Sequence, residues 1–225
     1  MKSPHLLRST RGIAAILAAG VLLAALPPAA SARKYPEPSL YPLTKRFWYL
    51  KFKHGMPKRI AVAVPGQLAP SAYWYLTYTV TNDSDREVDF TPEFEMVTRD
   101  GKIHRSDKSI PLAVFQAVKK REGNDLLLSA NKIAGPLHQG EDQAKDGVAI
   151  WEEPIARMGD FSIYASGLNS EYVNATDADG KPMTDADGHP ITLRKTLQLN
   201  FVIWGDEAKP DLDEVHGKPE RWLMR

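Results

Sequence analysis

Of the 225 residues, 43% are hydrophobic, 25% are charged and none is cysteine, a composition that fits a globular domain and excludes a disordered chain or a disulfide-stapled mini-protein. The 29 lysine and arginine residues nearly balance the 28 aspartate and glutamate residues, so the chain lacks the basic field that holds nucleic-acid phosphates. We therefore expect no nucleic-acid partner. The lack of cysteine also excludes thiolate catalysis and cysteine-type zinc sites.

Residues 1–32 have the pattern of a signal peptide. Three basic residues precede an uninterrupted apolar run, residues 12–26, and residues 30–32 read Ala-Ser-Ala, a small-x-small cleavage pattern. The apolar run is shorter than the roughly 20 residues that cross a bilayer as a helix. We therefore expect an exported protein, periplasmic or extracellular, that is attached to a membrane only where this segment remains uncleaved.

Three further segments follow the signal peptide. Residues 33–45 contain three prolines, which prevent regular backbone hydrogen bonding, so we expect a linker there. The folded domain is expected to span residues 46–205. Residues 206–225 are expected to form a C-terminal tail.

Over most of the domain, apolar and polar residues alternate with the period of two that is typical of strands. Alternating apolar side chains predict strands over residues 48–53 and 60–64, and His-Gly-Met-Pro at residues 54–57 predicts a turn between them. The strongest run, residues 73–82, is rich in aromatic and β-branched side chains and predicts a central strand. Apolar residues of one parity predict a long final strand over residues 191–203.

The period changes within residues 109–137, where we expect a short helical insertion. Apolar residues recur at helical spacing over residues 112–118, basic residues follow them, and Gly123 is placed to end the helix. A second helical turn is expected over residues 126–128, before Gly135 and a proline stop it.

The pattern of many short strands with one helical insertion predicts a mainly β fold, an antiparallel β-sandwich. The stretches at residues 73–82, 140–151 and 194–197 resemble uncharacterised exported proteins of bacteria, notably planctomycete-type ones. The first of them, with its Tyr-Thr-Val-Thr-Asn sequence, resembles the strand and turn of immunoglobulin-like envelope domains. This resemblance implies an immunoglobulin-like sandwich that lacks the inter-sheet cysteine pair of antibody domains, and it implies no activity.

Two copies of Asp-Ala-Asp-Gly, at residues 177–180 and 185–188, are candidates for a calcium site, because Ca²⁺ takes several oxygen ligands from one loop. The candidate ligands are Asp177, Asp179, Asp185 and Asp187. The spacing does not match an EF-hand loop, whose twelfth position falls here on alanine or arginine. The alternative is that each Asp-Gly pair supplies the positive-φ turn of a hairpin leading into the final strand.

Tyr73 and Tyr75 are candidates for a ligand or partner site. They lie on the parity opposite to Trp74, so they face either solvent or an element that covers the sheet. Exposed aromatic rings stack on sugars or anchor a protein partner, whereas a helical insertion packed over the sheet buries them. The same two alternatives apply to Phe47 and Tyr49.

Charged residues of one loop and two histidines are the candidates for a loop-based hydrolase site. Such a site needs Glu141, Asp142 and Asp146, or His104 and His138, to converge in one pocket. For the loop, the alternative is a solvated turn before a buried strand. The motifs of α/β-hydrolases, P-loop proteins and dinucleotide enzymes are absent from the sequence.

These patterns favour a non-enzymatic exported domain, a binding or structural module of the bacterial cell envelope, whose partner is an envelope protein or a surface polysaccharide. A carbohydrate-binding sandwich and a hydrolase are the alternatives, because a fold does not by itself determine a function. No cofactor is expected, apart from calcium if the aspartate turns bind it.

Overall fold

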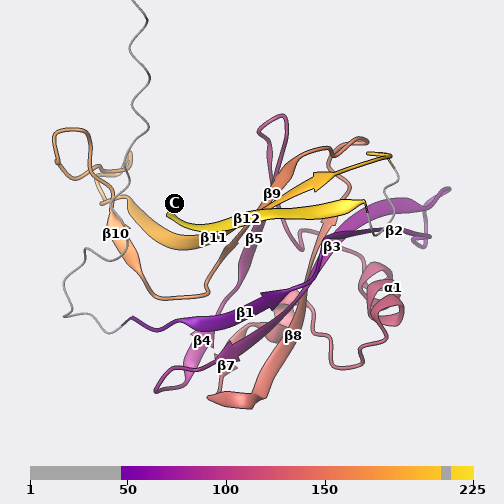
Figure 1. Ribbon diagram of the computed structural model, residues 1–225, viewed down its shortest axis with the longest axis horizontal. Coiled ribbons are helices and arrows are strands. Elements are labelled where there is room, and N and C mark those ends of the chain that lie inside the picture. The colour runs from indigo at the N-terminus through magenta and orange to yellow at the C-terminus, as the bar shows by residue number, and fades with distance from the viewer. Residues whose placement is uncertain (1–46, 209–213) are drawn as a thin grey trace, which may run out of the picture. The chain divides into compact units, whose positions relative to one another are not determined.

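The computed structural model describes residues 47–208 and 214–225, which belong to one compact unit, Tyr35–Arg225. The expected signal peptide, residues 1–32, and the expected linker, residues 33–45, lie outside the described residues. None of the described helices is long and apolar enough to span a membrane. The described chain is mainly β, with two short helices between an N-terminal and a C-terminal group of strands (Figure 1).

The first sheet is centred on the long strand β3 (Ser71–Asn82). On one edge β3 pairs with β8 (Gly140–Glu152), and on the other it pairs in succession with β1 (Leu50–His54) and β2 (Lys58–Val62). All of these pairings are antiparallel. The central strand expected from the aromatic and β-branched run is therefore confirmed.

Residues 54–57 form a bulge and not the predicted turn. The register passes from His54 opposite Tyr78 to Lys58 opposite Tyr75, so three residues of one strand oppose two of the other. The amide of Gly55 still donates to the carbonyl oxygen of Thr77 at 2.9 Å. Glycine and proline mark bulges as well as turns, which is why the local sequence did not distinguish the two.

The second sheet has the strand order β12, β11, β9, β5, β6, and a short strand, β10, pairs with the beginning of β11. Its pairings are also antiparallel. The strands are β5 (Glu93–Thr98), β6 (Ile103–Arg105), β9 (Phe161–Ser166), β10 (Tyr172–Asn174), β11 (Thr192–Ile203) and β12 (Val215–Met224). A separate two-stranded ladder joins β4 (Val88–Phe90) to β7 (Gly135–Leu137).

The C-terminal segment is part of the sheet and not the tail expected for residues 206–225. β12 pairs with β11 along most of its length, and its ends are anchored by the buried side chains of Val215 and Met224. The intervening residues carry a glycine, a proline and several charges, so the sequence lacks an alternating apolar pattern. This composition is typical of an edge strand, and periodicity alone does not detect it.

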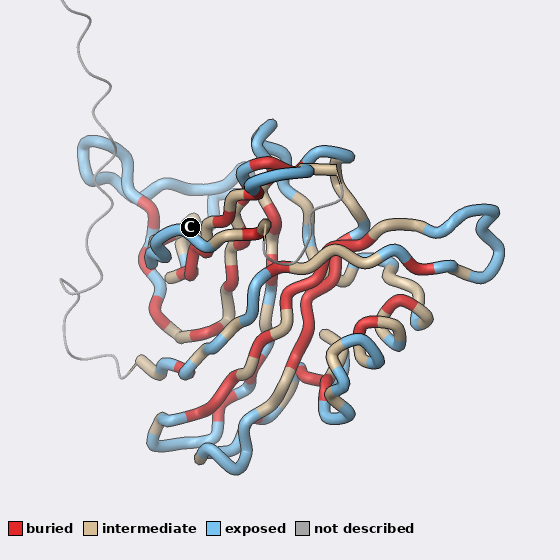
Figure 2. Tube along the Cα trace, turned by 45° about the vertical axis from the view of Figure 1, so that its right-hand side comes forward, coloured by how far each residue is buried: buried red, intermediate tan, exposed pale blue. Residues whose placement is uncertain are grey.

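The two sheets pack face to face around the main core. The ring of Trp74 on β3 lies 5.5 Å from that of Phe161 on β9, and the ring of Tyr78 lies 4.8 Å from that of Phe94 on β5. The side chains of β11 that point inward, among them Leu199, complete this core cluster. Figure 2 shows that buried residues follow the strands and that exposed residues follow the connections. The described fold is therefore a β-sandwich built from antiparallel sheets.

Helix α1 (Leu112–Glu122) covers the outer face of the first sheet. Its buried residues Val114 and Val118 join a second cluster with Tyr73, Tyr75 and Ile150. Gly123 ends the helix in the left-handed region, as predicted. The second short helix, α2 (Ala130–Ile133), begins later than the residues 126–128 expected for it.

Along the edge of β8 that faces away from β3, individual residues form hydrogen bonds with the strand. Leu128 exchanges backbone hydrogen bonds with the strand at Asp146 and Val148. Further along, the amide of Asp107 donates to the Ile150 carbonyl oxygen at 2.7 Å, and the Asp107 carboxylate accepts from the Ile150 amide at 3.3 Å. These contacts satisfy backbone groups that would otherwise present an open sheet edge.

Candidate functional site

The start of β1, β10 and the C-terminal end of β12 lie near one another (Figure 1), and each of these three segments carries an exposed aromatic residue. Tyr49, Tyr172 and Trp222 keep 46%, 42% and 41% of their surface exposed. The rings of Tyr49 and Trp222 lie 5.0 and 5.6 Å from the ammonium group of Lys195, within the range of a cation–π contact.

A buried ion pair holds this group in place. The ammonium group of Lys195 donates to Oε2 of Glu171 at 2.9 Å, and the hydroxyl of Tyr49 donates to the same oxygen. Glu171 is only 2% exposed, and among the described residues its second oxygen, Oε1, has no hydrogen-bond partner. Burial, with the bond to Glu171, raises the pKa of Tyr49 to about 12, so its hydroxyl stays protonated above the pH at which an ordinary tyrosine ionises.

Beside this pair lies a cavity of about 420 Å³, which we call the β10 cavity. Its walls combine two aromatic rings with hydrogen-bonding side chains. They include Trp48, Asp89, Asn169, Tyr172, Thr192 and Arg194. The volume lies within the range of about 300–1,000 Å³ in which small molecules bind.

A second cavity, of about 610 Å³, adjoins the first at Trp48, which lines both. We call it the β1 cavity. Its walls include Phe47, Trp48, Tyr49, Lys51, Ser84 and Asp85. The two cavities together are called the aromatic cleft below.

The connection between β9 and β10 forms one wall of the cleft and is fixed by its own contacts. Gly167 has a φ of +81°, and a Cβ atom at this position would lie 2.2 Å from the carbonyl oxygen of Thr91, so only glycine fits. The side-chain nitrogen of Asn169 donates to the Lys195 carbonyl oxygen at 3.1 Å, and its side-chain oxygen accepts from the backbone amide of Glu171 at 3.0 Å. This wall is therefore preorganised before any ligand arrives.

Tyr73 and Tyr75 do not form the surface platform considered from the sequence. They are 3% and 0% exposed, because α1 packs over the face of the sheet on which they lie. The hydroxyl of Tyr75 donates to Glu122 at 2.6 Å, and burial raises the pKa of Tyr75. These rings belong to the second core, whereas Tyr49 does reach the surface.

The two Asp-Ala-Asp-Gly segments form turns of the same geometry. Oδ1 of Asp177 accepts from the amides of Asp179 and Lys181 at 3.0 and 2.9 Å, and Asp185 repeats these bonds with Asp187 and His189. The glycine of each copy has a positive φ, as the turn interpretation predicted. Calcium binding at the four aspartates stays a prediction.

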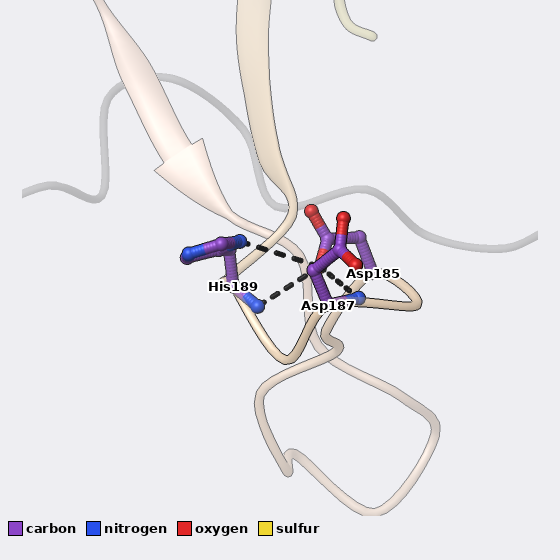
Figure 3. Close-up of side chains that lie close together, drawn as sticks. All are labelled: Asp185, Asp187 and His189. Carbon is purple, nitrogen blue, oxygen red and sulfur yellow. Dashed lines mark hydrogen bonds and ion pairs between the residues drawn. The ribbon is translucent and has the colours of Figure 1, made fainter.

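In the second turn, Asp185, Asp187 and His189 bring one potential metal ligand each within 4.8 Å of one another (Figure 3). All three residues are exposed, and Oδ1 of Asp185 already accepts two backbone amides. The first turn has Lys181 in place of the histidine, so it does not repeat this group of three potential ligands.

The remaining candidates are used in separate contacts. Asp146 accepts from Thr79 and Asn124 at 2.7 and 2.8 Å and lines another cavity, of about 310 Å³. Glu141 pairs with Lys51, and Asp142 is exposed. His138 pairs with Glu87, whereas His104 lies beside Trp151.

Sequence reasoning missed the ion pair of Glu171 and Lys195. Both residues resemble ordinary surface charges in their local sequence, and their partner Tyr49 lies 122 positions from Glu171. One signal was present, because Lys195 lies on the otherwise apolar parity of the final strand. A charge on such a face needs a buried partner.

Comparison of the chain with protein-family models, with curated proteins and with solved structures finds no match in any of the three. The resemblance to planctomycete-type exported proteins therefore has no support from these comparisons.

Proposed function

We propose that this chain is an exported, non-enzymatic binding module of the bacterial cell envelope, and that it binds a surface polysaccharide in the aromatic cleft. Export is supported by the basic, apolar and small-x-small pattern of residues 1–32. An immunoglobulin-like sandwich is part of the proposal, and it is supported by the two packed antiparallel sheets.

The observation that carries the proposal is the mixture of rings and polar groups in one preorganised hollow. A sugar presents C–H faces, which stack on aromatic rings, and hydroxyl groups, which need hydrogen-bond partners. The β10 cavity offers rings from Trp48 and Tyr172 beside the polar side chains of Asp89, Thr192 and Arg194. Such convergence of apolar and polar groups is typical of ligand sites.

Binding is favoured over hydrolysis by the state of the carboxylates. Glu171 and Asp89 both line the β10 cavity, but Glu171 is buried and its Oε2 already accepts from Lys195 and Tyr49. Glycoside hydrolysis in most families needs two carboxyl groups that both reach the scissile bond. Because its Oε2 is held by Lys195 and Tyr49 and the side chain is buried, this carboxylate is suited to positioning the rings around it.

The shape of the site favours a polysaccharide over a protein partner. The rings line hollows of about 420 and 610 Å³, whereas the centre of a protein interface is a close-packed apolar patch. A chain of sugars reaches into a hollow and makes polar contacts with its walls.

The proposal is tested by measuring the binding of the purified protein to a panel of soluble and insoluble bacterial polysaccharides. We expect Tyr172→Ala and Arg194→Ala each to weaken binding about tenfold or more, because both side chains line the cavity. Trp204→Ala is the matched control, since Trp204 is 64% exposed and its ring lies 4.0 Å from that of His216, outside the cleft. Retained binding in both cleft variants, or no binding of any polysaccharide by the unmodified protein, would contradict the proposal.

A further inference from the structure

We propose that the β10 cavity and the β1 cavity are two successive subsites for one linear oligosaccharide, which passes over Trp48. This inference rests on the function proposed above and adds a property of the ligand, namely that it is a chain whose units occupy both cavities.

Trp48 ties the two cavities together. Its amide donates to the Ser170 hydroxyl at 3.0 Å, and its carbonyl oxygen accepts from the Ser170 amide at 3.1 Å. Its ring packs against the main core. Because both its backbone and its ring are held, Trp48 is a fixed divider between the two cavities and not a side chain that closes one of them.

The two cavities offer the same chemistry. The β10 cavity places Tyr172 beside charged and hydroxyl side chains, and the β1 cavity places Tyr49 beside Lys51 and Ser84. Both tyrosine rings are about equally exposed, at 42% and 46%. Two adjoining sites with the same combination of a ring and polar groups fit a ligand made of repeated units.

The size of the cleft supports the same conclusion. Each cavity alone lies within the range of about 300–1,000 Å³ that holds a small ligand. A single sugar unit therefore leaves one cavity empty, and a longer chain gains contacts in the second without a second loss of translational freedom.

The experiment is a titration of the full protein with length series of oligosaccharides, from one to six units, of glucose, N-acetylglucosamine and galacturonic acid. Affinity for the sugar that binds is expected to rise at least tenfold between two and five units and then to level off. Lys51→Met is expected to weaken binding of the longest chain several-fold more than that of the disaccharide.

Glu141→Gln is the matched control for Lys51→Met. The Lys51 ammonium pairs with Glu141 at 2.8 Å, so both variants break the same ion pair, but only Lys51 lines the β1 cavity. Glu141→Gln should leave the length dependence unchanged.

Three results would overturn the inference. Equal affinity for two and six units would show a single subsite while leaving carbohydrate binding intact. Loss of the length dependence in Glu141→Gln would assign the effect to the ion pair and not to the cavity. Failure of every sugar at every length would remove the proposed function as well.

Discussion

Lys195 is held in the sandwich by a carboxylate and two aromatic rings, so its substitution affects more than one charge. We expect Lys195→Met to lower the free energy of unfolding by about 3 kcal/mol, because it leaves Glu171 charged and buried without its cation. Urea denaturation measures this change. The double variant Glu171→Gln with Lys195→Met should recover part of the loss, since both charges are then absent.

Lys218 provides the comparison for this prediction. It pairs with Asp160 at 2.7 Å, but the two side chains are 44% and 62% exposed. Lys218→Met should therefore change the free energy of unfolding by less than about 1 kcal/mol. Similar costs for Lys195→Met and Lys218→Met would show that Glu171 and Lys195 are no more than a surface pair.

Asp107 makes the stability of the fold depend on pH. Burial raises the pKa of its carboxyl group from 3.8 to about 6, against the opposing hydrogen bonds from Ser106 and Ile150. The folded protein therefore holds this proton more tightly than the unfolded chain, and the contribution of Asp107 to stability is lost as the pH rises from about 4 to about 6.

Comparison with Asp107→Asn isolates this effect, because asparagine can still accept the hydrogen bond from the Ile150 amide without titrating. Urea denaturation at several pH values should show the unmodified protein losing stability relative to Asp107→Asn between pH 4 and 6. Parallel curves for the two proteins would mean that the carboxyl group titrates normally.

At the level of elements, β12 shows most clearly how the structure departs from the sequence pattern. If Val215–Met224 is an edge strand of the sandwich, Met224→Ala should cost about 2–4 kcal/mol, because Met224 is 3% exposed. Glu220 lies on the same strand as Met224, is half exposed and pairs with His54. Glu220→Gln should therefore cost less than about 1 kcal/mol. A cost for Met224→Ala below about 0.5 kcal/mol would restore the tail interpretation.

The strands with a regular period were predictable from sequence, and the elements without one were not. The parity of β3 placed Trp74 in the main core, and the long run before Ile203 gave β11 nearly its observed bounds. β12 lacks the period, and Gly55 suits a turn as well as a bulge. In both cases the structure is decided by pairing with a strand that is distant in the sequence. The local sequence carries no sign of this pairing.

The candidate site was predictable only in part for the same reason. Tyr49 was considered as an exposed ring because its parity opposes that of Trp48. Tyr73 had the same local pattern, but α1 covers it. Which of two equivalent rings reaches the surface depends on where the helical insertion packs, and this is a property of the whole fold.

On the scale of the whole molecule, the two sheets are covered differently. The outer face of the first sheet is closed by α1, while the outer face of the second carries a polar network that includes Gln198, Asn200 and Ser162. The aromatic cleft lies at the end of the sandwich, where Tyr49, just before β1, pairs with Asn169, which precedes β10. A rigid sandwich that presents preorganised rings at one end is suited to holding a ligand without changing shape.

The most direct test of this account uses four of the five tryptophans, Trp48, Trp74, Trp151 and Trp204, as reporters of position. Their indole N–H signals, assigned by single substitutions, are followed in ¹H–¹⁵N spectra while the oligosaccharide that binds best is added. We predict that the signal of Trp48 shifts and saturates, while those of Trp74, Trp151 and Trp204 stay in place, because only Trp48 lines the cleft. A saturating shift of Trp204 without one of Trp48, or binding that moves none of these signals, would contradict the placement of the site.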